Sequence, residues 1–128
     1  MPSYVFPLLV AIGGALGALS RYGATLLLTK LAGPFFPYGT LAVNSAGSFF
    51  IGLLGVLLTR VYPIPGAAAL LITGYLGGLN TFSSFRNETM QFFLGGNPVE
   101  GFFYLFLQLA GGLLFVSLGY FLADRLFL

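Results

Sequence analysis

Four long apolar segments, separated by short breaks, decide what this sequence can fold into. They cover about residues 4–31, 38–61, 66–94 and 101–126. A helix needs about 20 apolar residues to cross the hydrocarbon core of a bilayer, and all four segments reach that length. We therefore expect an all-α membrane protein with four transmembrane helices.

The breaks between the segments consist of glycine and proline, which end helices because proline removes a backbone donor and restricts the residue before it. They fall at Gly33-Pro34 and Pro37, at Pro63 and Pro65, and at Gly95-Gly96-Asn97-Pro98. None is long enough for a soluble domain, so we expect residues 1–128 to form a single transmembrane domain. The first segment lacks a basic leader and exceeds the length of a signal peptide, which predicts a retained span.

Charge is too scarce for a protein dissolved in water. Only 6% of the residues are charged, against roughly 25% in soluble domains. Five cations and three anions cannot build a basic patch, which argues against a nucleic-acid partner. The chain has no cysteine and no histidine, so disulfides, thiolate chemistry and a histidine-centred metal site or base are excluded. No nucleophile–base pair stands out, and we expect no enzyme.

The few charges are spread almost evenly over the two sides that alternating spans would create. Arg60, Asp124 and Arg125 fall on one side, and Lys30 and Glu100 on the other, towards which Arg86 and Glu88 also lean. Orientation in the membrane follows the Lys/Arg bias of the loops, which here is close to nil. The count predicts insertion in both orientations; the alternative is that one orientation still dominates.

Polar residues inside membrane helices are costly, so those in the first two segments need a reason. Arg21 could snorkel, anchor the bundle or attract anions towards a vestibule. Thr40, Asn44 and Ser48 follow at helical spacing and place three hydrogen-bonding groups on one face. Asn44 is the strongest of them, because its own helix cannot satisfy its amide donors. It either joins two helices or lines a pathway.

The third segment contains the most informative cluster. Gly77-Gly78 and Asn80-Thr81 lie near its middle and favour unwinding of the helix, although a simple kink is the alternative. Unwound backbone at membrane depth needs protein or a water-filled cavity around it. Its freed carbonyls can bind a hard cation such as sodium.

Two phenylalanines, Phe82 and Phe85, follow this cluster with Ser83 and Ser84 between them. Such rings are usually packing residues. The functional alternative is that the positive ring edges, together with hydroxyls and an amide, replace the water around a small anion. A site without a full positive charge would hold the anion weakly enough for rapid exit.

These motifs resemble those of the Fluc/CrcB family of fluoride channels. The resemblance rests on residues 17–22, on Gly39 to Phe49 and on Gly77 to Phe85, which fall in order on three of the four segments. It implies an antiparallel, dual-topology homodimer in the inner membrane that lets cytoplasmic fluoride leak out passively and so confers fluoride resistance. Its partners would be fluoride, sodium and membrane lipid.

The resemblance also implies roles for particular residues. A structural sodium ion (Na+) at the dimer centre would be held by the backbone carbonyls of Gly77 and Asn80, at a break in the third helix. The fluoride pathway would involve Asn44, Phe82, Phe85, Ser83, Ser84, Thr40, Tyr104 and, in its vestibule, Arg21. Asn80 and Ser84 stand where the family usually has threonine, which puts a hydroxyl role at position 80 in doubt.

Two other functions compete with this interpretation. A small multidrug-resistance transporter would also be a four-helix, dual-topology dimer, but it needs a carboxylate deep in the first span, where this chain has only Arg21. A non-transporting membrane scaffold would explain the helices and glycines. It would not explain Asn44 together with the Gly-Gly-Asn-Thr cluster.

Overall fold

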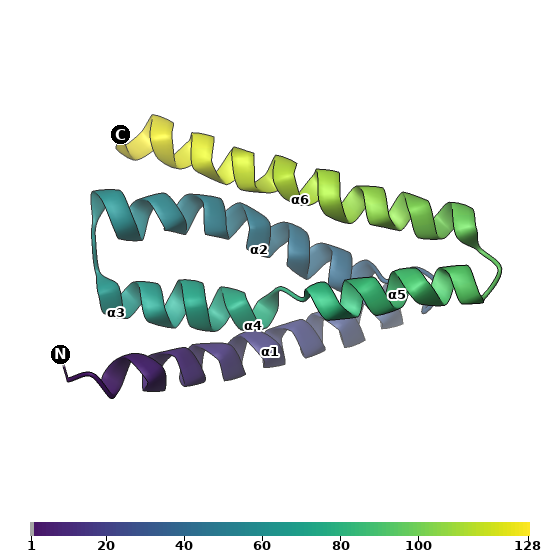
Figure 1. Cartoon of the computed structure of the whole chain (residues 1–128), viewed down its shortest axis with the longest axis horizontal. Coiled ribbons are helices and arrows are strands. Elements are labelled where there is room, and N and C mark those ends of the chain that lie inside the picture. Colours follow the sequence, from purple (N-terminus) through teal and green to yellow (C-terminus); the bar gives the residue numbers. More distant parts are fainter. Residues whose placement is uncertain (1) are drawn as a thin grey trace.

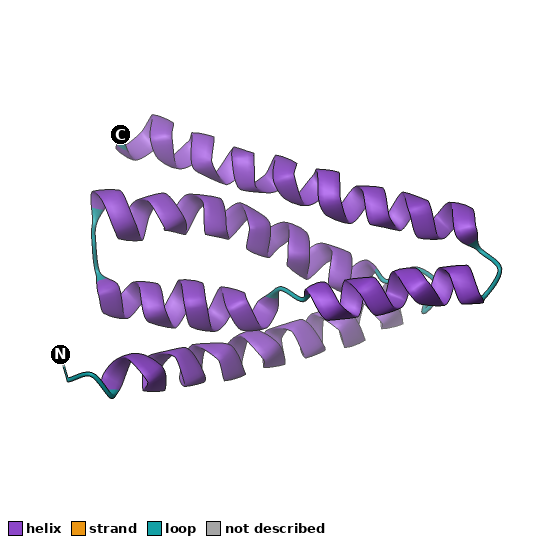
Figure 2. Cartoon of the chain, viewed as in Figure 1, coloured by secondary structure: helices purple, strands orange, loops and turns teal. Residues whose placement is uncertain are grey.

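The computed structural model describes residues 2–128 and shows a helical bundle in which the chain runs back and forth along one long axis (Figure 1). No strand occurs among the described residues, and only short loops join the helices (Figure 2). The expected all-helical fold class is confirmed.

Three of the four apolar segments form helices that are long and apolar enough to cross a membrane. These are α1 (Val5–Ala32), α2 (Tyr38–Val56) continued by the π-helical turn η1 (Leu57–Val61), and α6 (Pro98–Phe127). Helix α1 ends at Gly33, whose φ of 88° suits glycine. Helix α6 begins at Pro98, where a missing amide proton costs nothing.

The third apolar segment is built differently, from several consecutive pieces. They are α3 (Pro65–Ala67), the π-helical stretch η2 (Ala68–Leu76), α4 (Gly77–Leu79) and α5 (Phe82–Leu94). Between α4 and α5, Asn80 has ψ 146° and Thr81 has φ −144° and ψ 119°, so both are extended. In Figure 1 the pieces on either side of this helix break, Asn80-Thr81, follow each other along the bundle.

The distribution of side chains is the reverse of that in a soluble protein. Many large apolar side chains face outwards, such as Leu31 and Leu113, each 72% exposed. Several polar ones, including Thr40, Thr89 and Gln108, are buried. Such continuous apolar exposure would be an aggregation hazard in water, whereas lipid solvates it. The chain is therefore a multi-pass membrane protein.

Glycines bring the helices into close contact in two places. Helix α1 packs on η2 and α4, where a Cβ added to Gly17 would collide with the Tyr75 carbonyl oxygen. Helix α2 packs on α6, where a Cβ on Gly119 would collide with the Phe49 carbonyl oxygen. In lipid no hydrophobic effect holds helices together, so this close van der Waals contact supplies much of the association energy.

Adding one methyl group at Gly17 is expected to destabilise the bundle by about 1–3 kcal/mol, because backbone on the facing helix must move. Gly23, on the same helix, is the matched control, since an added Cβ there meets nothing within 4 Å. Thermal unfolding in detergent should show a lower midpoint for Gly17→Ala and an unchanged or higher one for Gly23→Ala. Equal midpoints for the two variants would contradict the close packing.

Candidate functional site

The side chain of Asn44 on α2 holds the helix break in place. Its Oδ1 accepts a hydrogen bond of 2.8 Å from the Thr81 amide, and its Nδ2 donates one of 2.9 Å to the Thr81 carbonyl. In an α-helix the amide of Thr81 would instead donate to the carbonyl of Gly77, four residues earlier. One amide side chain thus replaces the backbone partners that the break removes.

The neighbouring backbone groups show where the helical pattern stops. The amide of Asn80 still donates to the Leu76 carbonyl at 3.0 Å, and the Asn80 side-chain Nδ2 reaches the same oxygen at 3.0 Å. The next carbonyl, that of Gly77, loses Thr81 as its helical donor. The Gly78 carbonyl receives the Arg21 Nε from α1 at 3.1 Å. The break therefore frees the Gly77 carbonyl, while the Gly78 carbonyl accepts a hydrogen bond from Arg21.

Helix α5 begins inside the bundle with a side-chain cap. The Oγ1 of Thr81 accepts from the Ser84 amide at 3.2 Å, and it lies 3.4 Å from the Ser83 hydroxyl. Threonine is a favoured residue at this position because its oxygen satisfies a free amide of the first turn. The remaining amides of that turn have no partner within the helix and carry its positive end.

A chain of hydrogen bonds, which we call the polar chain, leads away from Asn44 through three helices. The Asn44 Nδ2 donates to Gln108 Oε1 at 3.2 Å, and Gln108 Nε2 donates to the Tyr104 hydroxyl at 2.9 Å. That hydroxyl donates to Glu88 Oε1 at 2.9 Å, and the Thr40 hydroxyl donates to Glu88 Oε2 at 2.8 Å. The chain starts and ends on α2 and passes through α6 and α5.

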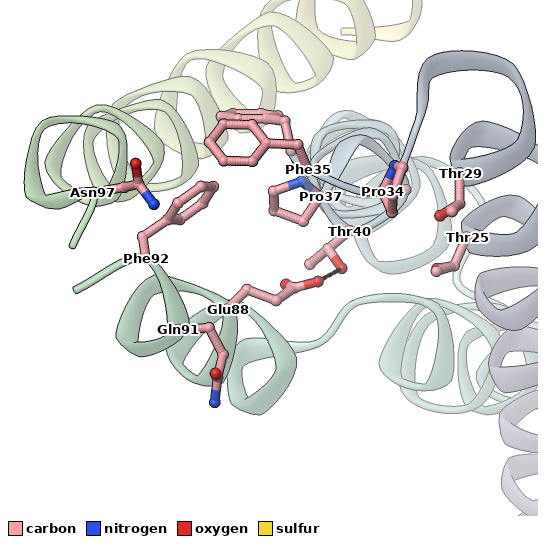
Figure 3. A pocket seen from close by; sticks show the side chains of 12 residues that line it. Thr25, Thr29, Pro34, Phe35, Pro37, Thr40, Glu88, Gln91, Phe92 and Asn97 are labelled. Atoms are coloured by element: carbon pink, nitrogen blue, oxygen red, sulfur yellow. Dashed lines mark hydrogen bonds between the residues drawn. The ribbon is translucent and has the colours of Figure 1, made fainter. Parts of the chain in front are cut away.

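Two cavities lie at the ends of the polar chain. The break cavity, about 380 Å³, is lined by Asn44, Ser48, Asn80, Thr81, Phe82, Phe85, Gln108 and Leu109. The loop cavity, about 390 Å³, lies beside the α1–α2 loop and includes Thr40 and Glu88, whose hydrogen bond is drawn in Figure 3. Tyr104 is fully buried (0% exposed) and lines neither cavity. The polar chain therefore connects the two cavities through a buried tyrosine.

The aromatic rings beside the break stand almost perpendicular to one another. The centroids of Phe82 and Phe85 are 5.4 Å apart with an interplanar angle of 85°, and Phe85 meets Tyr104 at 5.7 Å and 75°. Phe82 is 58% exposed, whereas Phe85 is only 2% exposed. Perpendicular packing directs a ring edge, which carries partial positive charge, at its neighbour.

Most of the residues singled out in the sequence come together here. Asn44, Asn80, Phe82 and Phe85 line one cavity. Thr40 and Tyr104 belong to the polar chain. Ser83 and Ser84 lie at the start of α5 beside the Thr81 cap, and Arg21 reaches the break through the Gly78 carbonyl. Arg21 itself lines neither cavity.

Two members of the polar chain were missed as site residues. Gln108 is a buried amide in the middle of the last apolar segment, and its cost in lipid was a usable signal. Glu88 was noticed in the sequence without a role. Both of its oxygens accept hydroxyl groups from other helices, which nothing in its sequence neighbourhood shows.

Fold and site together define a class: a multi-pass helical membrane protein with a polar path through its bundle at a helix break. The family model described as CrcB-like protein, Camphor Resistance (CrcB), matches residues 8–120. The chain belongs to this family.

Curated relatives agree over most of their length. A protein of Desulfotalea psychrophila is 44% identical over 119 residues, which are 93% of this chain and 92% of the relative. One from Hydrogenobaculum is 42% identical over 120 residues, 93% and 98% of the two chains. One from Rhizobium etli is 46% identical over 99 residues, 77% and 79%. All three bear the name "Fluoride-specific ion channel FluC", which denotes a channel and no enzyme.

Removing the Asn44 side chain is expected to loosen the helix break. Asn44→Ala removes both hydrogen bonds to the partly buried Thr81 backbone, a cost of about 1 kcal/mol for each bond. Amide hydrogen exchange at Thr81 should therefore become faster. Ser48→Ala, in the same cavity and one helical turn away, should leave that exchange unchanged. Protection of Thr81 in the Asn44→Ala protein would show that other groups hold the break.

Proposed function

We propose that this protein is a fluoride-selective channel that passively exports cytoplasmic fluoride across the inner membrane and so confers fluoride resistance. The observation that carries the proposal is the break cavity: two phenylalanine rings, amide groups and the start of a helix meet there in a chain whose relatives are named fluoride-specific channels. The path is chemically suited to a small anion, for the reasons that follow.

Several donors near the break are available to replace the water around fluoride. Gln108 uses one amide proton on Tyr104 and has a second. The hydroxyls of Ser83 and Ser84 lie in the first turn of α5. The amides and positive end of that turn attract an anion. None of these groups carries a full positive charge, so fluoride would be desolvated without being trapped.

The polar chain gives the anion a route beyond the break cavity. Tyr104 supplies a hydroxyl between the two cavities and Thr40 supplies one in the loop cavity, and both donate to Glu88. We infer that an arriving fluoride takes over such a hydroxyl while the carboxylate moves aside. Arg21, anchored on the Gly78 carbonyl, would bring positive potential close to the helix break.

The proposal extends to the membrane arrangement and the dimer. We infer that Pro65–Leu94 makes one crossing, broken at Asn80-Thr81, and that the protein is an antiparallel, dual-topology homodimer with two pathways. The near-zero Lys/Arg bias supports insertion both ways round. The exposure of Phe82 supports a partner subunit at this face, because a pathway wall needs cover on its open side.

The residues at the break also fit a structural sodium ion between the subunits. Sodium prefers oxygen ligands, and discontinuous membrane helices supply them as unwound carbonyls. The Gly77 carbonyl has lost its helical donor, and Asn80 lies in the extended stretch. The side-chain Oδ1 of Asn80 is buried without a hydrogen bond. An ion held there by Gly77 and Asn80 would fix the two breaks against each other.

Exchanging sodium tests this site directly. Replacing it with N-methyl-D-glucamine, a cation too large for such a cradle, should lower the thermal midpoint of the purified dimer, since a ligand stabilises the state it binds. Choline exchanged for N-methyl-D-glucamine is the matched control for a change of bulk cation. A thermal midpoint that does not change when sodium is replaced would contradict the proposed sodium site.

Fluoride efflux from proteoliposomes, followed with a fluoride electrode, tests the channel itself. Vesicles containing the protein should lose fluoride and retain chloride. Phe82→Ile and Phe85→Ile keep apolar bulk but remove the ring edge, and each should slow fluoride efflux by at least about tenfold while the dimer still assembles, because a ring-edge contact is lost at the barrier.

Phe121→Ile is the control for these variants, since Phe121 lies on the outer surface of α6, 60% exposed and away from the break. Its efflux should match that of the unaltered protein. Unchanged efflux in both Phe82→Ile and Phe85→Ile would remove the rings from the pathway, and unaltered protein that passes chloride as readily as fluoride would overturn the proposed function.

A further inference from the structure

Arg86, one turn after Phe82 on α5, makes a contact that none of the pathway roles described so far uses. Its guanidinium carbon lies 4.6 Å from the centroid of the Phe82 ring. This distance falls within the roughly 6 Å over which a cation is attracted to the negative face of an aromatic ring. Arg86 and Phe82 are both exposed, so the pair sits on the open side of the break.

The acid nearest in sequence does not neutralise Arg86. Glu88 lies two residues on, and its two carboxylate oxygens accept from the hydroxyls of Thr40 and Tyr104. The contact recorded for the guanidinium among the described residues is the one with the Phe82 ring. A cation over one face also draws the π electrons of the ring towards itself, which makes the hydrogens around the ring edge more positive.

The position of the Phe82 ring makes this consequential. Phe82 lines the break cavity together with Phe85, and the two rings stand at 85° to each other. The same ring thus contacts Arg86 and lines the cavity. An anion that uses the Phe82 edge would meet a ring whose orientation and polarity are set by an arginine that need not enter the path.

We propose that Arg86 is a positioning and selectivity-tuning residue for the anion path: it holds the Phe82 ring by a cation–π contact and strengthens the attraction of its edge for fluoride. The inference rests on the proposed fluoride channel. It differs from long-range electrostatic attraction, because the effect passes through one ring at contact distance, which is shorter than the Debye length, so salt in the solution screens it little.

The test measures fluoride conductance of the unaltered dimer, Arg86→Gln, Arg86→Lys and Arg60→Gln in liposomes. Glutamine keeps a polar side chain and removes the charge; lysine keeps the charge without the flat guanidinium. Arg60 is the matched control, because its guanidinium carbon also faces an aromatic ring and lies 5.9 Å from the centroid of the Tyr120 ring. Neither residue lines the break cavity or the loop cavity. Conductance is measured at about 0.01 M and about 0.1 M ionic strength, where the Debye length falls from about 30 Å to about 10 Å.

We expect Arg86→Gln to lower fluoride conductance about five- to tenfold at both ionic strengths, Arg86→Lys to lie between it and the unaltered protein, and Arg60→Gln to have no effect. Conductance of Arg86→Gln equal to that of the unaltered protein overturns the proposal. The proposal is also overturned if Arg86→Lys conducts as well as the unaltered protein and the loss in Arg86→Gln disappears at the higher ionic strength. That result would mean that Arg86 only attracts fluoride from the solution by its charge.

The failure of the channel proposal itself would look different. Unaltered protein without fluoride conductance overturns both proposals at once, whereas a conducting protein that is indifferent to Arg86 overturns only this one. If Arg86→Gln does not assemble, as judged by its elution on size exclusion, the comparison of Arg86→Lys with Arg60→Gln decides. A lysine variant with full conductance at both ionic strengths then counts against a role for the guanidinium.

Discussion

A helical segment can be interrupted inside a packed bundle only where something replaces the hydrogen bonds that it loses, and in this protein Asn44 does so. Its amide both accepts from and donates to the backbone of Thr81, at 2.8 and 2.9 Å. Water does that work in a soluble protein, but hydrocarbon offers none. The rest of the site depends on this pair of bonds, since they fix where α4 stops and α5 starts.

Several features of the site follow from placing a helix start inside the bundle. The positive end of α5, its threonine cap and the two rings of Phe82 and Phe85 all meet beside the break. The Asn44 side-chain amide, which binds the backbone at the break, also begins the polar chain that runs through Gln108 and Tyr104 to Glu88. The groups that give structural support thus also form the route that we propose for an anion. Glycines such as Gly17 and Gly119 let the flanking helices approach closely enough to enclose them.

The sequence predicted the helical class well, because apolar segments of membrane-spanning length leave few other folds. It also pointed to Asn44 and to the Gly-Gly-Asn-Thr cluster, because polar groups and glycines are conspicuous in lipid-facing sequence. It could not show that Asn44 binds Thr81, 37 positions away, or that Glu88 is shared by Thr40 and Tyr104. Such contacts depend on how helices rotate against each other. Gln108 was overlooked because the motifs of the family resemblance lie on the first three segments, although a single amide in an apolar segment is costly in lipid.

The central claim is that a charge-poor site at a helix break passes fluoride and rejects a larger halide. The reversal potential of the purified protein in a planar bilayer, with fluoride on one side and chloride on the other, measures this most directly. The account predicts a reversal potential close to that of a membrane permeable to fluoride alone. A potential near zero, as for a pore that does not distinguish the two anions, would contradict it.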